Sequence, residues 1–141
     1  MHALPILLTN DDGVYSSGLI DLAKLLHSQG HPLLVMAPIG EQSASGMKLT
    51  LRDGMQFKEH PEIASSIIVD DSTPLRVFSL DGSPCDCVIV AIDGGLERLA
   101  PGISPALCVS GINRGPNLSV DVLHSGTVSA AREASLYGMP A

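Results

Sequence analysis

Short apolar runs recur along the chain and are separated by polar or glycine-rich stretches. The runs at residues 5–9, 32–37 and 105–109 are apolar almost throughout, which predicts strands buried on both faces, as in a parallel sheet. Two shorter extended runs are expected at residues 66–69 and 75–80. The pattern therefore predicts a sheet whose central strands are parallel.

Three stretches between these runs have helical character. Residues 16–30 place apolar side chains at helical spacing, begin with serine caps and end in glycine. Ser83 followed by Pro84 is typical of a helix start and predicts a helix to residue 92. Residues 127–137 predict a third helix, which glycine and proline terminate. Helices and strands alternate, as in an α/β fold.

The pattern between the first and second predicted helices departs from this alternation. Residues 48–57 alternate around Asp53-Gly54 and predict a β-hairpin. We therefore expect an α/β fold with three layers, α/β/α and Rossmann-like, containing a mainly parallel sheet and a β-hairpin insertion. In such folds ligands bind beyond the carboxyl ends of the strands. The loops at residues 10–13, 38–46 and 110–126 meet that condition.

Composition limits the function classes. The chain has 141 residues, which suits a single domain over residues 1–141, and its net charge of −7 argues against a nucleic-acid duplex as partner. No apolar run is long enough for a membrane span, and no export signal is visible, so we expect a cytoplasmic protein. Cys85, Cys87 and Cys108 are read as small buried hydrophobes in a reducing compartment.

Asn10-Asp11-Asp12-Gly13 follows the first predicted strand directly. Two adjacent carboxylates at a strand end repel each other unless a cation lies between them, which favours a hard divalent metal. An ordinary Asx-type turn also explains the same four residues. The two interpretations remain open for this motif taken alone.

The neighbouring loops add neutral oxygen side chains. Carboxylates with Ser and Asn oxygens fit Mg²⁺ or Mn²⁺ and leave positions for water and a phosphate, and Ca²⁺ fits as an occupant. We expect one divalent ion per subunit. The candidate metal ligands are Asp11, Asp12, Ser43 and Asn113.

Ser125-Gly126-Thr127 opens the last predicted helix, where backbone N–H groups and the helix dipole favour an anion. Plain capping by Ser125 or Thr127 is the alternative. The candidate phosphate or substrate contacts are Asn10, Ser45, Gly46, Asn117, Ser125, Gly126 and Thr127.

Several of these motifs occur together in one known family. In this order along the chain, the sequence resembles the SurE (survival protein E) family of metal-dependent nucleotidases. The motifs are Asn10-Asp11-Asp12-Gly13, Gln42-Ser43-x-Ser45-Gly46, Gly82-Ser83-Pro84-x-Asp86-Cys87-Val88, Ser110-Gly111-Ile112-Asn113-Arg114-Gly115-x-Asn117 and Ser125-Gly126-Thr127-Val128-x-Ala130-Ala131-x-Glu133.

The resemblance implies hydrolysis of nucleoside 5′- and 3′-monophosphates, with Asp11 and Asp12 as catalytic residues and, with Ser43 and Asn113, as metal ligands. It also implies a cytoplasmic homo-dimer or homo-tetramer. The sequence departs from the family pattern at Ser83, Ser119 and His124. The family continues beyond the point where this sequence stops, so we expect a piece of a longer enzyme.

Other phosphate-binding classes fit less well. Gly40 to Gly46 lacks the spacing of a P-loop, and Met47 stands where that motif has Lys. Phosphotransfer sites of the receiver or haloacid type resemble ones that use a late Lys, and none follows Lys58. A non-enzymatic module that binds a divalent cation and phosphate is the alternative to a nucleotidase.

Overall fold

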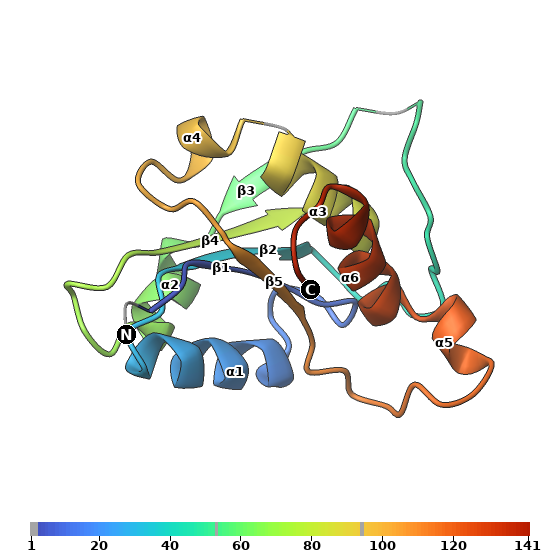
Figure 1. Cartoon of the computed structure of the whole chain (residues 1–141), viewed down its shortest axis with the longest axis horizontal. Coiled ribbons are helices and arrows are strands. Elements are labelled where there is room, and N and C mark those ends of the chain that lie inside the picture. The colour runs from blue at the N-terminus through green and yellow to red at the C-terminus, as the bar shows by residue number, and fades with distance from the viewer. Residues whose placement is uncertain (1–2, 53, 94) are drawn as a thin grey trace.

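Five strands form one sheet in the computed structural model, which describes residues 3–52, 54–93 and 95–141 (Figure 1). The strands are β1 (Ile6–Thr9), β2 (Leu33–Pro38), β3 (Phe57–Glu59), β4 (Leu75–Leu80) and β5 (Leu107–Ser110). Their order is β3-β4-β2-β1-β5, with β3 antiparallel to β4 and every other pair parallel. The mainly parallel sheet expected from the apolar runs is confirmed.

Helices cover both faces of the sheet. They are α1 (Ser17–Ser28), α2 (Pro61–Ile67), α3 (Pro84–Asp93), α4 (Leu96–Leu99), α5 (Asp121–His124) and α6 (Gly126–Leu136). Side chains alternate along β1, so that Leu7 packs in one core with Val88 of α3 and Ala130 of α6, whereas Leu8 packs in the other with Leu19 of α1. This arrangement gives the three layers that the sequence predicts. No helix in the described ranges is long and apolar enough to cross a membrane.

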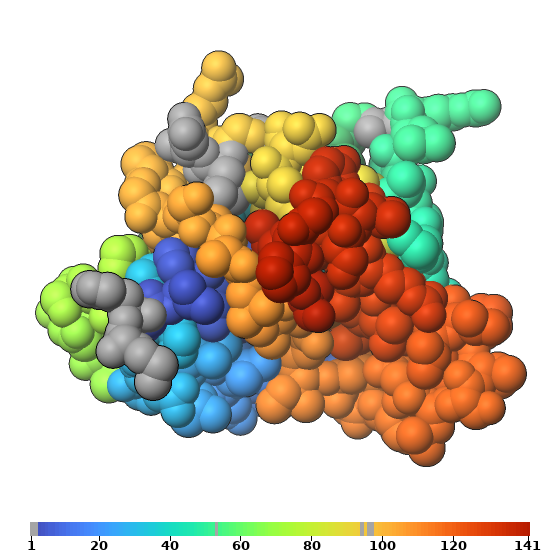
Figure 2. All heavy atoms as spheres, in the orientation of Figure 1, coloured from blue at the N-terminus to red at the C-terminus, as the bar shows by residue number. Residues whose placement is uncertain are grey.

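The segment between β2 and β3 differs from the expected hairpin. Within the part that the structure describes, residues 48–52 and 54–56 form no strand, and Asp53 of the expected turn lies outside it. The reason is that the polar groups of Lys48 and Thr50 bond to the start of α3 instead of to a second strand. In Figure 2 the teal part of this segment extends away from the orange region of α5 along one side of the molecule.

The extended run expected at residues 66–69 is wrong, because its first two residues belong to α2 and the other two form no strand. Pro61 occupies the first turn of this helix, where its missing N–H costs nothing, and Glu62 adds the negative charge that a helix start favours. Ile63 and Ile67, four residues apart, then share the buried face. Helical spacing decided this element over local β-propensity.

The three cysteines are free thiols in the core, as the sequence predicts. Burial raises the pKa of Cys85 and of Cys108 to about 12 and raises that of Cys87 well above its usual range. The folded state therefore keeps protons that the unfolded chain loses above about pH 8.5. We expect the free energy of unfolding to fall from that pH up to about 12, by up to about 1.4 kcal/mol per pH unit for each thiol.

Urea unfolding at pH 8.0, 9.5 and 10.5 measures this slope. Cys108→Ala removes one of the three thiols and should make the slope shallower than in the parent, even though the substitution itself costs stability. Equal slopes in the two proteins would show that the thiols do not cause the alkaline loss of stability.

Candidate functional site

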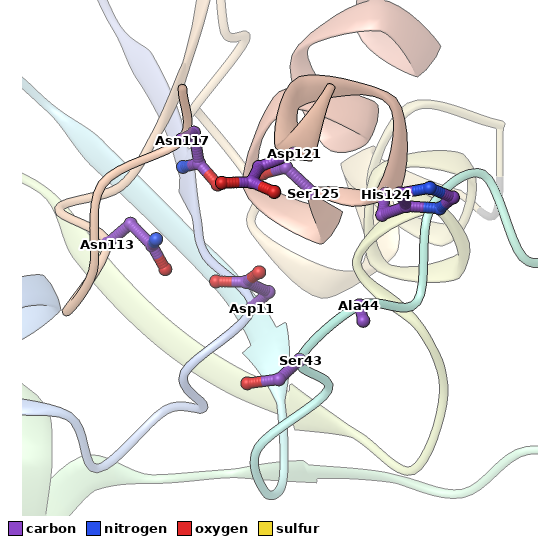
Figure 3. Close-up of a pocket in the computed structure, with 8 residues that line it drawn as sticks. All are labelled: Asp11, Ser43, Ala44, Asn113, Asn117, Asp121, His124 and Ser125. Carbon is purple, nitrogen blue, oxygen red and sulfur yellow. The ribbon is translucent and has the colours of Figure 1, made fainter. Parts of the chain in front are cut away.

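Three loops meet at one edge of the sheet. β1 lies between β2 and β5 and runs parallel to both, so the loops that follow these strands start side by side. A cavity of about 240 Å³ opens between them (Figure 3). Its lining residues are Asp11, Ser43, Ala44, Asn113, Asn117, Asp121, His124 and Ser125. The loops that the sequence groups by topology are therefore neighbours in space.

The turn after β1 is shaped by Asn10, which is fully buried. Its amide nitrogen donates to the Gly13 carbonyl at 3.1 Å and to Ser16 Oγ at 2.7 Å, and its amide oxygen accepts from the Gly13 N–H at 3.2 Å. Gly13 has a φ of +100°, and a β-carbon there would lie 3.2 Å from the backbone of Gly40. Asn10, a candidate substrate contact, thus builds the turn and is not among the cavity-lining residues.

Asp11 is 5% exposed and lies in the centre of the site in Figure 3. Its Oδ1 accepts a hydrogen bond from Thr127 Oγ1 at 2.6 Å, which links the end of β1 to the first turn of α6. No hydrogen bond to Oδ2 occurs within residues 3–52, 54–93 and 95–141. One oxygen of this carboxylate is therefore held by the fold and the other is available to a ligand.

Asp12 repeats this arrangement on the other side of the turn. Its Oδ2 accepts from the Arg114 N–H at 2.9 Å, and Oδ1 has no such partner in the described part of the chain. Asp12 lines a smaller hollow of about 120 Å³ that shares Asn113 with the larger cavity. Among the described residues, no Lys, Arg or His side chain pairs with Asp11 or Asp12.

The two neutral candidate ligands also keep an oxygen available. Ser43 Oγ donates to Glu41 Oε1 at 2.6 Å, and the Asn113 amide nitrogen donates to the Gly115 carbonyl at 2.7 Å. These bonds use the hydroxyl hydrogen of Ser43 and one amide hydrogen of Asn113, and they leave the hydroxyl lone pairs and the amide oxygen. The described residues contain no group of three or more His, Cys, Asp or Glu side chains placed to hold a metal ion. The donor set thus suits a hard divalent cation held by two carboxylates and neutral oxygens.

Two of the candidate phosphate contacts, Asn117 and Ser125, line the cavity, and the others lie around it. Ser125 caps α6 by accepting from the Val128 N–H at 3.1 Å, and it lines the cavity together with Asn117. The N–H groups of Gly126 and Thr127 have no backbone acceptor in the described ranges. These two N–H groups and the rim residues form the part of the site best suited to an anion.

Ser45 and Gly46 pack behind that helix start. The Ser45 hydroxyl oxygen is buried without a hydrogen-bond partner in the described residues, and a β-carbon added at Gly126 would lie 2.6 Å from it. The Gly46 N–H donates to the His124 carbonyl at 2.9 Å. The Gly46 N–H is therefore already bonded within the protein, whereas the Ser45 hydroxyl has no hydrogen-bond partner among the described residues.

Asp121 and His124 line the cavity, although neither was expected at the site from the sequence. Both belong to α5, a single helical turn inside the stretch expected to be a loop. Figure 3 shows the Asp121 carboxylate beside the Asn117 side chain. Their spacing of three residues directly before Ser125 is the sequence signal that could have found them, since residues i and i+3 share a helix face.

The chain is similar to proteins of one known family. The model of the family described as "Survival protein SurE" matches residues 6–141. The chain is 40% identical over 141 residues to the "5'-nucleotidase SurE" of Caldanaerobacter subterraneus and 43% identical over 137 residues to that of Carboxydothermus hydrogenoformans. The two matches cover 100% and 96% of this chain, and 50% and 47% of the respective relatives. The chain therefore spans about half the length of these relatives.

A solved structure shows the same fold. The SurE protein from Aquifex aeolicus matches with a TM-score of 0.74 and 35% sequence identity, over 96% of this chain and 48% of that one. Together with the family match over residues 6–141, this shows that the chain belongs to the SurE family.

Proposed function

We propose that this chain carries the metal- and phosphate-binding site of a phosphomonoesterase that hydrolyses nucleoside 5′-monophosphates, and 3′-monophosphates as well. The observation that carries the proposal is the hydrogen bonding of the Asp11 carboxylate. Thr127 fixes one of its oxygens, and the other remains available beside the start of α6. Relatives named "5'-nucleotidase SurE" support the reaction class.

One divalent ion, Mg²⁺ or Mn²⁺, fits the donor set. Asp11, Asp12, Ser43 and Asn113 would hold it, because each has an oxygen that the described hydrogen bonds leave unused. Such an ion polarises a phosphoryl group and lowers the pKa of a bound water.

The chain's own groups supply orientation. Thr127 fixes the rotation of the Asp11 carboxylate, and the Arg114 N–H fixes that of Asp12, so that neither needs to reorganise when a ligand binds. The N–H groups of Gly126 and Thr127 and the dipole of α6 favour the phosphate. Asn117 and Asp121 also line the cavity and are available to the part of the substrate beyond the phosphate.

The test is phosphate release from a panel of nucleoside 5′- and 3′-monophosphates with Mg²⁺, with Mn²⁺ and with a chelator. We expect hydrolysis that requires the metal, because the two carboxylates alone would repel a phosphate dianion. Hydrolysis that is unchanged by the chelator would contradict the proposal.

A module that binds a divalent cation and phosphate without turnover is the second candidate. The observation that favours it is that the chain spans about half the length of its relatives. Isothermal titration with Mn²⁺, combined with the phosphate-release assay, distinguishes the two: binding without hydrolysis identifies the module, and no binding contradicts both.

We also propose a cytoplasmic homo-dimer or homo-tetramer that acts on free nucleotides rather than on duplex nucleic acid or a membrane. Three free buried thiols support a reducing compartment. Apolar side chains at Leu51, Leu118 and Leu136 are 84%, 66% and 74% exposed, which supports burial against another copy. Light scattering of the chain measures its mass in solution.

A further inference from the structure

Residues 43–50, which we call the site loop, join the cavity to the start of α3. Ser43 lines the cavity at one end of the site loop, and Thr50 lies at the other end against Asp86. The Asp86 side chain is 3% exposed and accepts three hydrogen bonds. Two of them come from Thr50, from its N–H at 3.0 Å and from its hydroxyl at 2.8 Å. The third comes from the Ser83 N–H at 2.8 Å.

Only the third of these bonds is needed to cap α3. Ser83 and Asp86 form a reciprocal cap, in which Ser83 Oγ accepts from the Asp86 N–H at 3.1 Å and Asp86 accepts from the Ser83 N–H. Ser83 Oγ also donates to the Lys48 carbonyl at 2.5 Å. The bonds to Lys48 and Thr50 add nothing to the helix cap, and their effect is to fasten the site loop.

The fit around Asp86 is close. A β-carbon added at Gly82 would lie 3.0 Å from Asp86 Oδ2 and 2.9 Å from Met55 Sδ, so a side chain at this position would displace the carboxylate or the segment beyond the site loop. The carboxylate is therefore confined to the place where it meets Thr50.

The site loop is held on its other side by the junction of α5 and α6. The Gly46 N–H donates to the His124 carbonyl at 2.9 Å, and Ser45 packs against Gly126. The loop is thus fixed between two helix starts, that of α3 and that of α6. Gly46 is only four residues before Thr50, so a displacement of Thr50 would also displace Gly46.

We propose that Asp86 is a positioning residue for the site: by holding Lys48 and Thr50, directly and through Ser83, it sets the position of Ser43 and Ser45 beside Asp11. Asp86 touches no ligand itself and acts through the site loop. The last step, from loop position to ligand binding, rests on the function proposed above.

Thr50→Val tests this with the α3 cap intact, because it removes only the hydroxyl bond to Asp86. We expect amide hydrogen exchange at Gly46 and Thr50 to become about tenfold to a hundredfold faster, as for the loss of one hydrogen bond to a charged group. Mn²⁺ affinity, measured by titration calorimetry, should fall about threefold to tenfold. Thr50→Ser keeps the hydroxyl and should restore both values, and Asp86→Asn should act in the same direction as Thr50→Val.

Thr73→Val is the matched control, since Thr73 Oγ1 makes the same kind of bond to Asp70 at 3.2 Å on a distant exposed turn. It should leave Gly46 exchange and Mn²⁺ affinity unchanged. Unchanged Gly46 exchange in Thr50→Val and Asp86→Asn would overturn the proposal, and so would faster exchange with unchanged Mn²⁺ affinity. If the parent chain binds no Mn²⁺, the proposed function fails, and Gly46 exchange alone then decides whether Asp86 positions the loop.

Discussion

Asp11→Asn is expected to abolish metal-dependent hydrolysis and to weaken Mn²⁺ binding by more than about a hundredfold, beyond what loss of a supporting contact costs at a metal site. The substitution removes one of the two negative charges that balance the cation. It keeps an oxygen that can still accept the bond from Thr127 Oγ1, so the link between β1 and α6 survives. Circular dichroism and the melting temperature should therefore remain close to those of the parent.

Asp21→Asn is a matched control, because Asp21 is an exposed carboxylate on α1 that the site does not use. It changes the net charge by the same amount without touching the cavity. Parent-like hydrolysis and Mn²⁺ affinity in Asp11→Asn would show that Asn10-Asp11-Asp12-Gly13 is only a turn, which is the alternative that the sequence leaves open.

Gly126→Ala is expected to destabilise the chain by about 1 to 3 kcal/mol, the usual cost of overpacking a close contact. Replacing Gly by Ala in a helix is ordinarily favourable. Here the added β-carbon would lie 2.6 Å from Ser45 Oγ and 2.8 Å from Asp11 Cβ, distances that real side chains do not adopt. Ser45 and Asp11 must both move away from residue 126, so phosphate binding at the start of α6 should be lost as well.

Chemical denaturation gives the free energy of unfolding, and titration with inorganic phosphate in the presence of Mn²⁺ gives the binding. Gly40→Ala is the control, since a β-carbon at Gly40 meets nothing within 4 Å. It should affect neither quantity strongly. A Gly126→Ala protein as stable as the parent, with parent-like phosphate affinity, would show that the close approach of α6 to Asp11 has no functional importance.

The centre of the sheet was predictable because β1 and β2 are buried along their whole length and read as continuous apolar runs. Three runs, at residues 5–9, 32–37 and 105–109, became β1, β2 and β5 with small shifts at their ends. The expected hairpin failed for a physical reason. Alternation around Asp53-Gly54 is a local signal, whereas Thr50 bonds to Asp86, 36 residues later in the chain.

By itself the sequence determined the parallel sheet, the loops that follow its strands and the oxygen-bearing side chains in them, because each depends on patterns within a few residues. Only the tertiary structure decided how those side chains are used. It placed Asn10 in the turn, brought α5 with Asp121 and His124 to the cavity, and joined Asp11 to Thr127 across 116 residues. A contact between residues so far apart in the chain depends on how α6 packs on the sheet. The spacing of residues within a short stretch of sequence does not contain that information.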